Sequence, residues 1–166
     1  MTKPICVMTG PPGAGKTTTG LAVATLLDVP FRDTDGDIEE AAGKPIPEIF
    51  IDEGEAYFRA LESAAVATAL STFDGVLALG AGAILAEHNR EALRGHVVVH
   101  LQTGFAEALH RIGLGAGRPL LAVNPRATLK HLLEQRLPLY QAVATITVVT
   151  DGRKPEELAE DIVSRL

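Results

Sequence analysis

The residues with the clearest chemistry form a phosphate-binding loop near the start of the chain. Residues 10–17 read Gly-Pro-Pro-Gly-Ala-Gly-Lys-Thr, which matches the pattern G-x-x-x-x-G-K-[ST] in full. Glycines let the backbone turn until successive N–H groups point at one anion, and the following helix adds its positive dipole end. In this motif Lys16 reaches the β- and γ-phosphates and the Thr17 hydroxyl binds Mg²⁺. The segment predicts a site for a nucleoside triphosphate.

Two aspartates follow the second expected strand, in the segment Asp33-Thr34-Asp35. Residues two apart in an extended chain project to the same side, so both carboxylates can face one cleft. In an open parallel sheet that cleft lies at the carboxyl ends of the strands, where the phosphate-binding loop also lies. We expect one carboxylate to hold Mg²⁺ through water and the other to orient an acceptor hydroxyl. The alternative is that Asp35 only caps the next helix.

Two other interpretations of this segment fail on the neighbouring residues. Residues 33–36 match the D-x-x-G pattern of GTPases, but the chain contains no N-K-x-D guanine motif. Asp33 also begins a pattern like that of an EF-hand loop, yet Ile38 stands where glycine is needed and Lys44 where glutamate is needed. The segment therefore predicts neither a GTPase nor a calcium site.

Small residues and arginines further along could complete a site for an acidic acceptor. Gly80-Ala81-Gly82 follows an expected strand, where small residues let a ligand lie against the backbone, although an ordinary turn is an equal alternative. Arg118 lies in a glycine-rich loop and could close over a transferring phosphoryl group. Arg59 and Arg136 could bind a carboxylate through bidentate contacts, although their periodicity alone favours exposed helix charges.

Alternating strand-like and helix-like segments must position these residues. Short apolar runs predict strands at 5–8, 29–33, 76–79, 97–101 and 146–149. Helical segments are expected at 16–27, 35–42, 55–70, 89–94, 105–112, 125–141 and 155–166. This order predicts an α/β fold, a three-layer sandwich around a five-stranded parallel sheet, in one domain over residues 1–166. The loop at 113–124 has the length and glycine content of a mobile lid.

Composition and charge exclude several classes of partner. The formal net charge of −6 argues against a nucleic acid or an anionic membrane. No apolar stretch approaches membrane-spanning length, and residues 1–4 lead directly into the first strand, so we expect a cytoplasmic protein without a signal peptide. The single cysteine, Cys6, is expected to be a small buried hydrophobe. The absence of an obvious exposed apolar stripe favours a monomer.

Taken together, these segments resemble the shikimate kinase family. The phosphate-binding loop, Asp33-Thr34-Asp35, Phe58-Arg59 and the segments 79–82, 117–121 and 136–140 occur in the order and approximate spacing of that family. The resemblance spans nearly the whole chain. It implies a P-loop fold like that of nucleoside-monophosphate kinases, with strand order 2-3-1-4-5. It also implies transfer of the ATP γ-phosphate to the 3-hydroxyl of shikimate in aromatic amino-acid biosynthesis.

The resemblance further implies a role for each site residue. Asp35 receives or orients the hydroxyl, while Lys16 and Arg118 neutralise charge on the γ-phosphoryl group. Arg59 and Arg136 bind the shikimate carboxylate, assisted by the backbone of Gly80, Ala81 and Gly82. Glu62 holds Arg59, Phe50 and Phe58 line the ring, and Asp33 supports through water the Mg²⁺ bound to Thr17. The residues implied for ATP are Gly13, Ala14, Gly15, Lys16, Thr17, Thr18, Arg111, Arg118, Arg153 and Pro155, with Arg111 and Pro155 flanking the adenine.

One residue departs from the family pattern, which usually has three glycines where this chain has Gly80-Ala81-Gly82. Alanine keeps the N–H group but adds a methyl group and disfavours a positive φ. An ordinary φ at residue 81 preserves the backbone hydrogen bond, whereas a required positive φ lowers shikimate affinity. Two alternatives stay open: a kinase for another small hydroxylated acid such as gluconate, and a nucleotide-sensing module without turnover. A nucleoside-monophosphate kinase fits less well, because residues 33–35 offer no nucleobase site.

Overall fold

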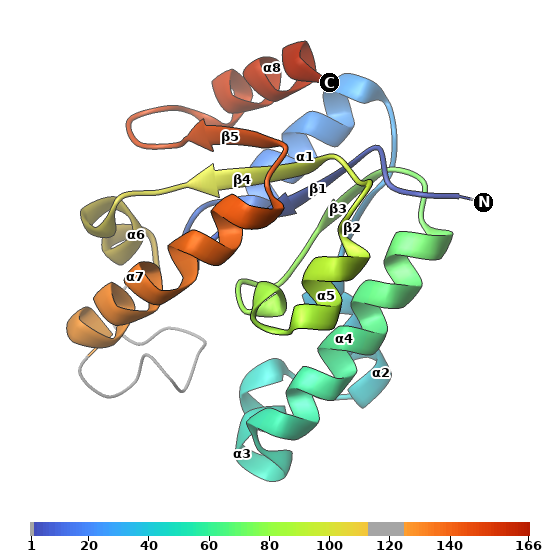
Figure 1. The fold of residues 1–166 in the computed structure, drawn as a ribbon, viewed down its shortest axis with the longest axis vertical. Coiled ribbons are helices and arrows are strands. Elements are labelled where there is room, and N and C mark those ends of the chain that lie inside the picture. Colours follow the sequence, from blue (N-terminus) through green and yellow to red (C-terminus); the bar gives the residue numbers. More distant parts are fainter. Residues whose placement is uncertain (1, 113–124) are drawn as a thin grey trace.

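The computed structural model describes residues 2–112 and 125–166, and its centre is a five-stranded sheet (Figure 1). The order across the sheet is β2-β3-β1-β4-β5, and every pairing is parallel. The strands are β1 (Cys6–Thr9), β2 (Phe31–Asp33), β3 (Val76–Ala78), β4 (Val98–Gln102) and β5 (Ile146–Val149). The predicted fold class and strand order are confirmed.

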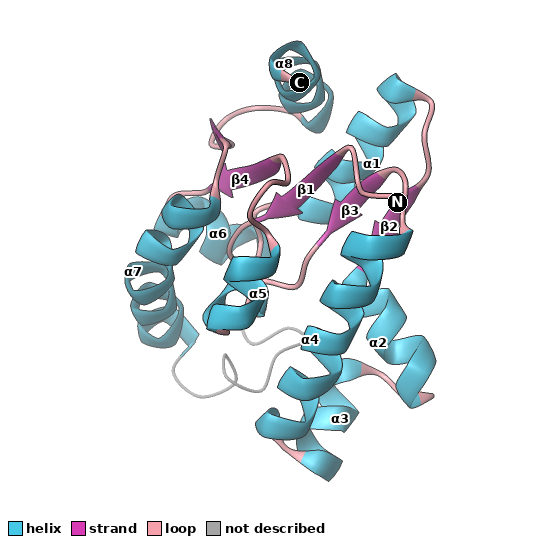
Figure 2. Ribbon diagram, turned by 45° about the vertical axis from the view of Figure 1, so that its right-hand side comes forward, coloured by secondary structure: helices cyan, strands magenta, loops and turns pink. Residues whose placement is uncertain are grey.

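Helices cover both faces of the sheet and make the outer two layers (Figure 2). Helices α1 and α8 pack on one face, and α4, α5 and α7 lie on the other. The helices are α1 (Lys16–Leu27), α2 (Thr34–Ala42), α3 (Ile46–Glu53), α4 (Glu55–Thr72), α5 (Glu87–Ala92), α6 (Phe105–Ile112), α7 (Pro125–Val143) and α8 (Pro155–Arg165), with a 3₁₀ turn η1 (Ala83–Leu85) after β3.

The alternation of side chains along β1 explains why its residues from Cys6 to Met8 are all apolar. Cys6 and Met8 point into the core beneath α1 and α8, and Val7 points into the core beneath α4 and α7. All three side chains are fully buried, as expected for a parallel strand with helices on both faces. Burial raises the pKa of the Cys6 thiol to about 11, which agrees with its interpretation as a buried hydrophobe. No helix within the described residues is long and apolar enough to cross a bilayer.

Helix α3 was not predicted from the sequence. Ile46 and Ile49 pack with Ile38 and Phe58 in a small core of their own, apart from the sheet. The helix has only eight residues, too few for a convincing period, and Pro47 in its first turn resembles a loop signal. The apolar spacing of residues 46, 49 and 50 was the signal that could have revealed it.

The start of α2 also differs from the expectation that Asp35 caps this helix. The helix begins at Thr34, and Asp33 is the capping residue, because its Oδ1 accepts a hydrogen bond of 2.9 Å from the N–H of Asp35. An aspartate side chain accepts most readily from the N–H two residues on, so the first aspartate of the pair takes the cap. Asp35 is thereby left inside the first turn of α2.

His100 on β4 makes the stability of the fold depend on pH. The residue is 1% exposed, and its ring stacks on that of Tyr140 with centroids 5.1 Å apart. Burial lowers the pKa of His100 to about 4, from about 6.5 in an unfolded chain. Between these two pKa values the unfolded state therefore binds more protons than the folded state. The contribution of neutral His100 to the free energy of unfolding is complete above pH 6.5 and is lost as the pH falls toward 4.

We expect the free energy of unfolding of the natural chain to fall by about 2 kcal/mol more between pH 7 and pH 5 than that of His100→Phe. Phenylalanine keeps a ring against Tyr140 but cannot bind a proton. Urea unfolding of both proteins at the two pH values measures the difference. Equal losses in both proteins would mean that His100 does not carry this dependence.

Candidate active site

The phosphate-binding loop connects β1 to α1. Gly13 and Gly15 have φ values of 80° and 85°, a left-handed conformation that side chains with a Cβ rarely adopt. Lys16 folds back over the loop, and its Nζ donates to the carbonyl oxygens of Gly10 at 2.9 Å and Pro11 at 3.0 Å. Thr17 and Thr18 lie exposed in the first turn of α1. The loop therefore has the backbone shape and the ammonium group that a triphosphate requires.

Thr17 and Asp33 form the part of the site that fits a metal ion. The Thr17 hydroxyl donates to Asp33 Oδ2 at 3.0 Å. Burial, followed by the charge of Asp35, raises the pKa of Asp33, while hydrogen bonds from the Asp35 N–H and Thr17 and the charge of Lys16 oppose this rise. A partly desolvated carboxylate gains from a cation, so this pair fits Mg²⁺ completed by phosphate and water. Within the described residues no cluster of three or more metal-ligating side chains offers a closed protein cage, and Mg²⁺ does not need one.

Gly80, just after β3, brings two carboxylates from different helices together. A Cβ added at Gly80 would lie 2.7 Å from Oδ1 of Asp35 and 2.8 Å from Oε2 of Glu62. The N–H of Gly80 donates to the Thr34 hydroxyl at 3.3 Å. Only glycine lets the backbone approach both carboxylates this closely. Asp35 on α2 and Glu62 on α4 thus meet at one strand end.

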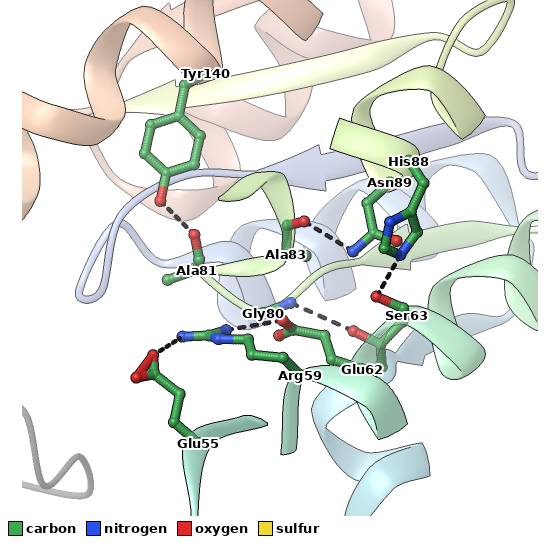
Figure 3. A network of polar contacts seen from close by, with 11 residues as sticks. Glu55, Arg59, Glu62, Ser63, Gly80, Ala81, Ala83, His88, Asn89 and Tyr140 are labelled. Carbon is green, nitrogen blue, oxygen red and sulfur yellow. Dashed lines mark hydrogen bonds and ion pairs between the residues drawn. The ribbon is translucent and has the colours of Figure 1, made fainter. Parts of the chain in front are cut away.

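Arg59 lies across the same turn, as Figure 3 shows. Its Nη1 donates to Oε1 of Glu62 at 2.8 Å, and the Glu62 side chain is 1% exposed. A Cβ added at Gly82 would lie 2.6 Å from Nη2 and 2.7 Å from Cζ of Arg59. The guanidinium therefore packs directly on the backbone of residue 82. Phe58 lies behind it in the core, with the guanidinium carbon 5.2 Å from its ring centroid, and Phe50 packs on Phe58.

Ala81 is held by Tyr140 from the opposite side (Figure 3). The Tyr140 hydroxyl donates to the carbonyl oxygen of Ala81 at 2.6 Å, and Ala81 is 3% exposed. Among the described residues other than glycine, Asp28 alone has a positive φ, so Ala81 has an ordinary backbone conformation. Alanine is therefore accommodated without backbone strain.

Arg136 lies one turn before Tyr140 on α7 and is 5% exposed. The interpretation of Arg136 as an exposed helix charge is therefore wrong, and Arg59 is mostly buried as well. Helical periodicity did not predict this burial, because the faces of α4 and α7 that carry these arginines meet other elements.

A family model described as shikimate kinase matches residues 12–166 of the chain. The chain belongs to the shikimate kinase family. The shikimate kinase of Salinispora tropica is 69% identical over 163 residues, which cover 98% of each chain. That of Thermobifida fusca is 54% identical over 164 residues, covering 99% of this chain and 95% of the relative. The protein is thus a small-molecule kinase that uses ATP.

Solved structures agree with this assignment. The shikimate kinase of Acinetobacter baumannii in complex with shikimate has a TM-score of 0.94 and 40% identity, and the match covers 99% of this kinase and 93% of that chain. The shikimate kinase of Bacteroides thetaiotaomicron has a TM-score of 0.84 and 31% identity, covering 97% of this kinase and 98% of that chain. A gluconokinase from Sinorhizobium meliloti has a TM-score of 0.56 at 17% identity, a likeness of fold alone.

The residues predicted to bind the base of ATP are only partly described. Arg153 precedes α8 and donates from Nη1 to Asp161 at 3.1 Å, and Pro155 begins α8. The backbone of Arg111 belongs to α6. Arg118 and the predicted lid at 113–124 lie outside the described residues.

Sequence reasoning missed a connection between the loop that precedes α6 and the loop that precedes α8. The N–H of Gly104, before α6, donates to both carboxylate oxygens of Asp151, at 3.1 Å and 3.2 Å. The hydroxyls of Thr103 and Thr150 are hydrogen-bonded at 2.7 Å. The loop between β4 and α6 is therefore joined to the loop between β5 and α8. The sequence contains no local signal for this pairing, since the partners lie 47 residues apart.

Removal of the Tyr140 hydroxyl tests how much its hydrogen bond to Ala81 contributes to the stability of this kinase. In Tyr140→Phe the buried carbonyl of Ala81 loses its donor, which we expect to lower the free energy of unfolding by about 1–3 kcal/mol. Urea unfolding measures this change. Tyr57→Phe is the matched control, because Tyr57 is 46% exposed and should change stability by less than about 0.5 kcal/mol. A Tyr140→Phe protein as stable as the control would show that the hydrogen bond contributes nothing.

Proposed function

We propose that this kinase transfers the γ-phosphoryl group of ATP to the 3-hydroxyl of shikimate. One observation carries the proposal: a carboxylate, Asp35, and a buried arginine network, Arg59 with Glu62, contact the same turn at residues 80–82. Asp33 links Asp35 to the phosphate-binding loop, because it accepts hydrogen bonds from both the Asp35 N–H and the Thr17 hydroxyl. The arrangement suits an acceptor with a hydroxyl beside the nucleotide and a carboxylate further away. The high identity to shikimate kinases supports the same substrate.

Asp35 is the group that orients the acceptor hydroxyl and takes its proton. The acceptor oxygen then bonds to the γ-phosphorus, and the bond from that phosphorus to the β-phosphate oxygen breaks, so that ADP leaves. Phosphoryl transfer needs mainly positioning and neutralisation of charge. Lys16, which already lies over the phosphate-binding loop, and Arg118 supply positive charge near the transferred group.

Arg59 and Arg136 bind the shikimate carboxylate. Guanidinium groups bind carboxylates through two parallel N–H donors, which a buried site strengthens. Glu62 fixes the orientation of Arg59, and the backbone of residues 80–82 supplies the surface on which the ring lies. Phe50 and Phe58 form the apolar wall behind it.

The proposal also includes the residues that bind Mg²⁺ and ATP. Mg²⁺ neutralises charge on the phosphates when bound, and Thr17 would hold it, with Asp33 acting through water. ATP is held by residues 13–18 of the loop, by Arg118 at its γ-phosphoryl end, and by Arg111, Arg153 and Pro155 near its base. We further propose a single-domain, cytoplasmic monomer that binds neither nucleic acid nor membrane.

A coupled assay of ADP release with Mg-ATP tests the proposal. Three reactions are compared, containing shikimate, gluconate or no acceptor. Fast release with shikimate alone is the expected result. Release with gluconate alone would reassign the acceptor, and ATP binding without acceptor-dependent release would favour a nucleotide sensor.

A further inference from the structure

Arg59 is held between two glutamates of its own helix, and the two contacts differ greatly (Figure 3). Glu62 accepts from Nη1 at 2.8 Å and is 1% exposed. Glu55 accepts from Nη2 at 3.4 Å, and its side chain is 48% exposed. Glu62 is therefore a fixed partner, whereas Glu55 holds a long, solvent-accessible contact that breaks at small cost.

The geometry of the Arg59 guanidinium determines which of its nitrogens an incoming carboxylate can use. Nε of Arg59 is buried and has no hydrogen-bond partner among the described residues. A bidentate carboxylate needs two neighbouring N–H donors of the guanidinium plane. The two such pairs of a guanidinium are Nη1 with Nη2 and Nε with Nη2, so a carboxylate that binds through either pair uses Nη2. Nη2 is the nitrogen that Glu55 occupies.

We propose that Glu55 sets the affinity of the acceptor site as an internal competitor for Arg59. The inference rests on the proposed function, in which Arg59 binds the substrate carboxylate. Glu55 occupies Nη2 while the site is empty and turns into solvent when the substrate carboxylate arrives. Its negative charge also disfavours a second anion beside Asp35 and Glu62. Glu55 thereby weakens the binding of carboxylates at Arg59, which keeps small anions off the site and eases product release.

The size of the effect follows from the exposure of Glu55. Exposed ion pairs of this kind contribute about 0.2–1 kcal/mol, which corresponds to up to about a five-fold change in a dissociation constant. Removing the charge of Glu55 without changing its shape should therefore tighten carboxylate binding by about two- to five-fold. A neutral analogue does not compete for Nη2 and should bind equally well to both proteins.

The experiment is isothermal titration of shikimate and of its methyl ester into the natural chain, Glu55→Gln and Glu48→Gln, without ATP. Glu48→Gln removes the same charge from the exposed surface of α3, where no hydrogen bond or ion pair of its side chain is seen among the described residues. We expect Kd for shikimate to fall about two- to five-fold in Glu55→Gln alone, and Kd for the ester to stay within about 1.5-fold in every protein.

Two outcomes would overturn the proposal. An unchanged Kd for shikimate in Glu55→Gln would mean that Glu55 does not compete, and a higher Kd would make Glu55 a residue that positions Arg59. Failure of the natural chain to bind shikimate at all would instead contradict the proposed function. The two failures are therefore distinguishable in the same titrations.

Discussion

Replacement of Asp35 by asparagine is expected to lower kcat by about 10²–10⁴-fold while ATP still binds. The Asp35 side chain lies against Gly80, within the first turn of a helix capped by Asp33. Asparagine keeps this shape but cannot take the proton of the acceptor hydroxyl. The coupled assay measures kcat, and titration with ATP measures nucleotide binding separately.

Asp74→Asn provides the control for this prediction, because Asp74 is exposed and lies in the turn before β3. Its kcat should stay within about two-fold of the natural chain. A near-normal kcat in Asp35→Asn would remove Asp35 from the mechanism. Loss of ATP binding in Asp35→Asn would show that the substitution acts through Asp33 on the phosphate-binding loop.

Replacement of Arg136 by lysine is expected to raise KM for shikimate by about 10–100-fold, with a much smaller change in KM for ATP. Hydrogen bonds to charged groups contribute about 1.5–3 kcal/mol, and an ammonium group cannot reproduce the planar fork of a guanidinium. Arg136 is 5% exposed, so water cannot substitute for the lost donors. Steady-state kinetics with each substrate varied in turn measures the two KM values.

Arg94→Lys is the matched control, because Arg94 is exposed and lies outside the acceptor site. It should leave both KM values unchanged. An unchanged KM for shikimate in Arg136→Lys would exclude Arg136 from carboxylate binding. An equal rise of both KM values would indicate a general disturbance of α7 instead.

The features that the sequence predicted correctly are those that depend on neighbouring residues. The phosphate-binding loop needs glycine at positions 13 and 15, and both have the left-handed φ that the motif requires. Strand β1 is buried at every position, and apolar at its first three, because helices cover both of its faces. The predictions from the sequence were incomplete or wrong where local signals are weak, at the short helix α3 and at the cap of α2.

The sequence by itself thus determined the sheet, the phosphate-binding loop and the family to which the chain belongs. Only the tertiary structure decided which side chains meet at the acceptor site: Asp35 and Glu62 at Gly80, Tyr140 at Ala81, and Glu55 at Nη2 of Arg59. Tyr140 and Ala81 lie 59 residues apart. Periodicity identifies the buried face of a helix, but the partner on that face depends on how distant elements pack. The conformation of a few consecutive residues can therefore be predicted from the sequence, whereas the contacts between distant segments cannot.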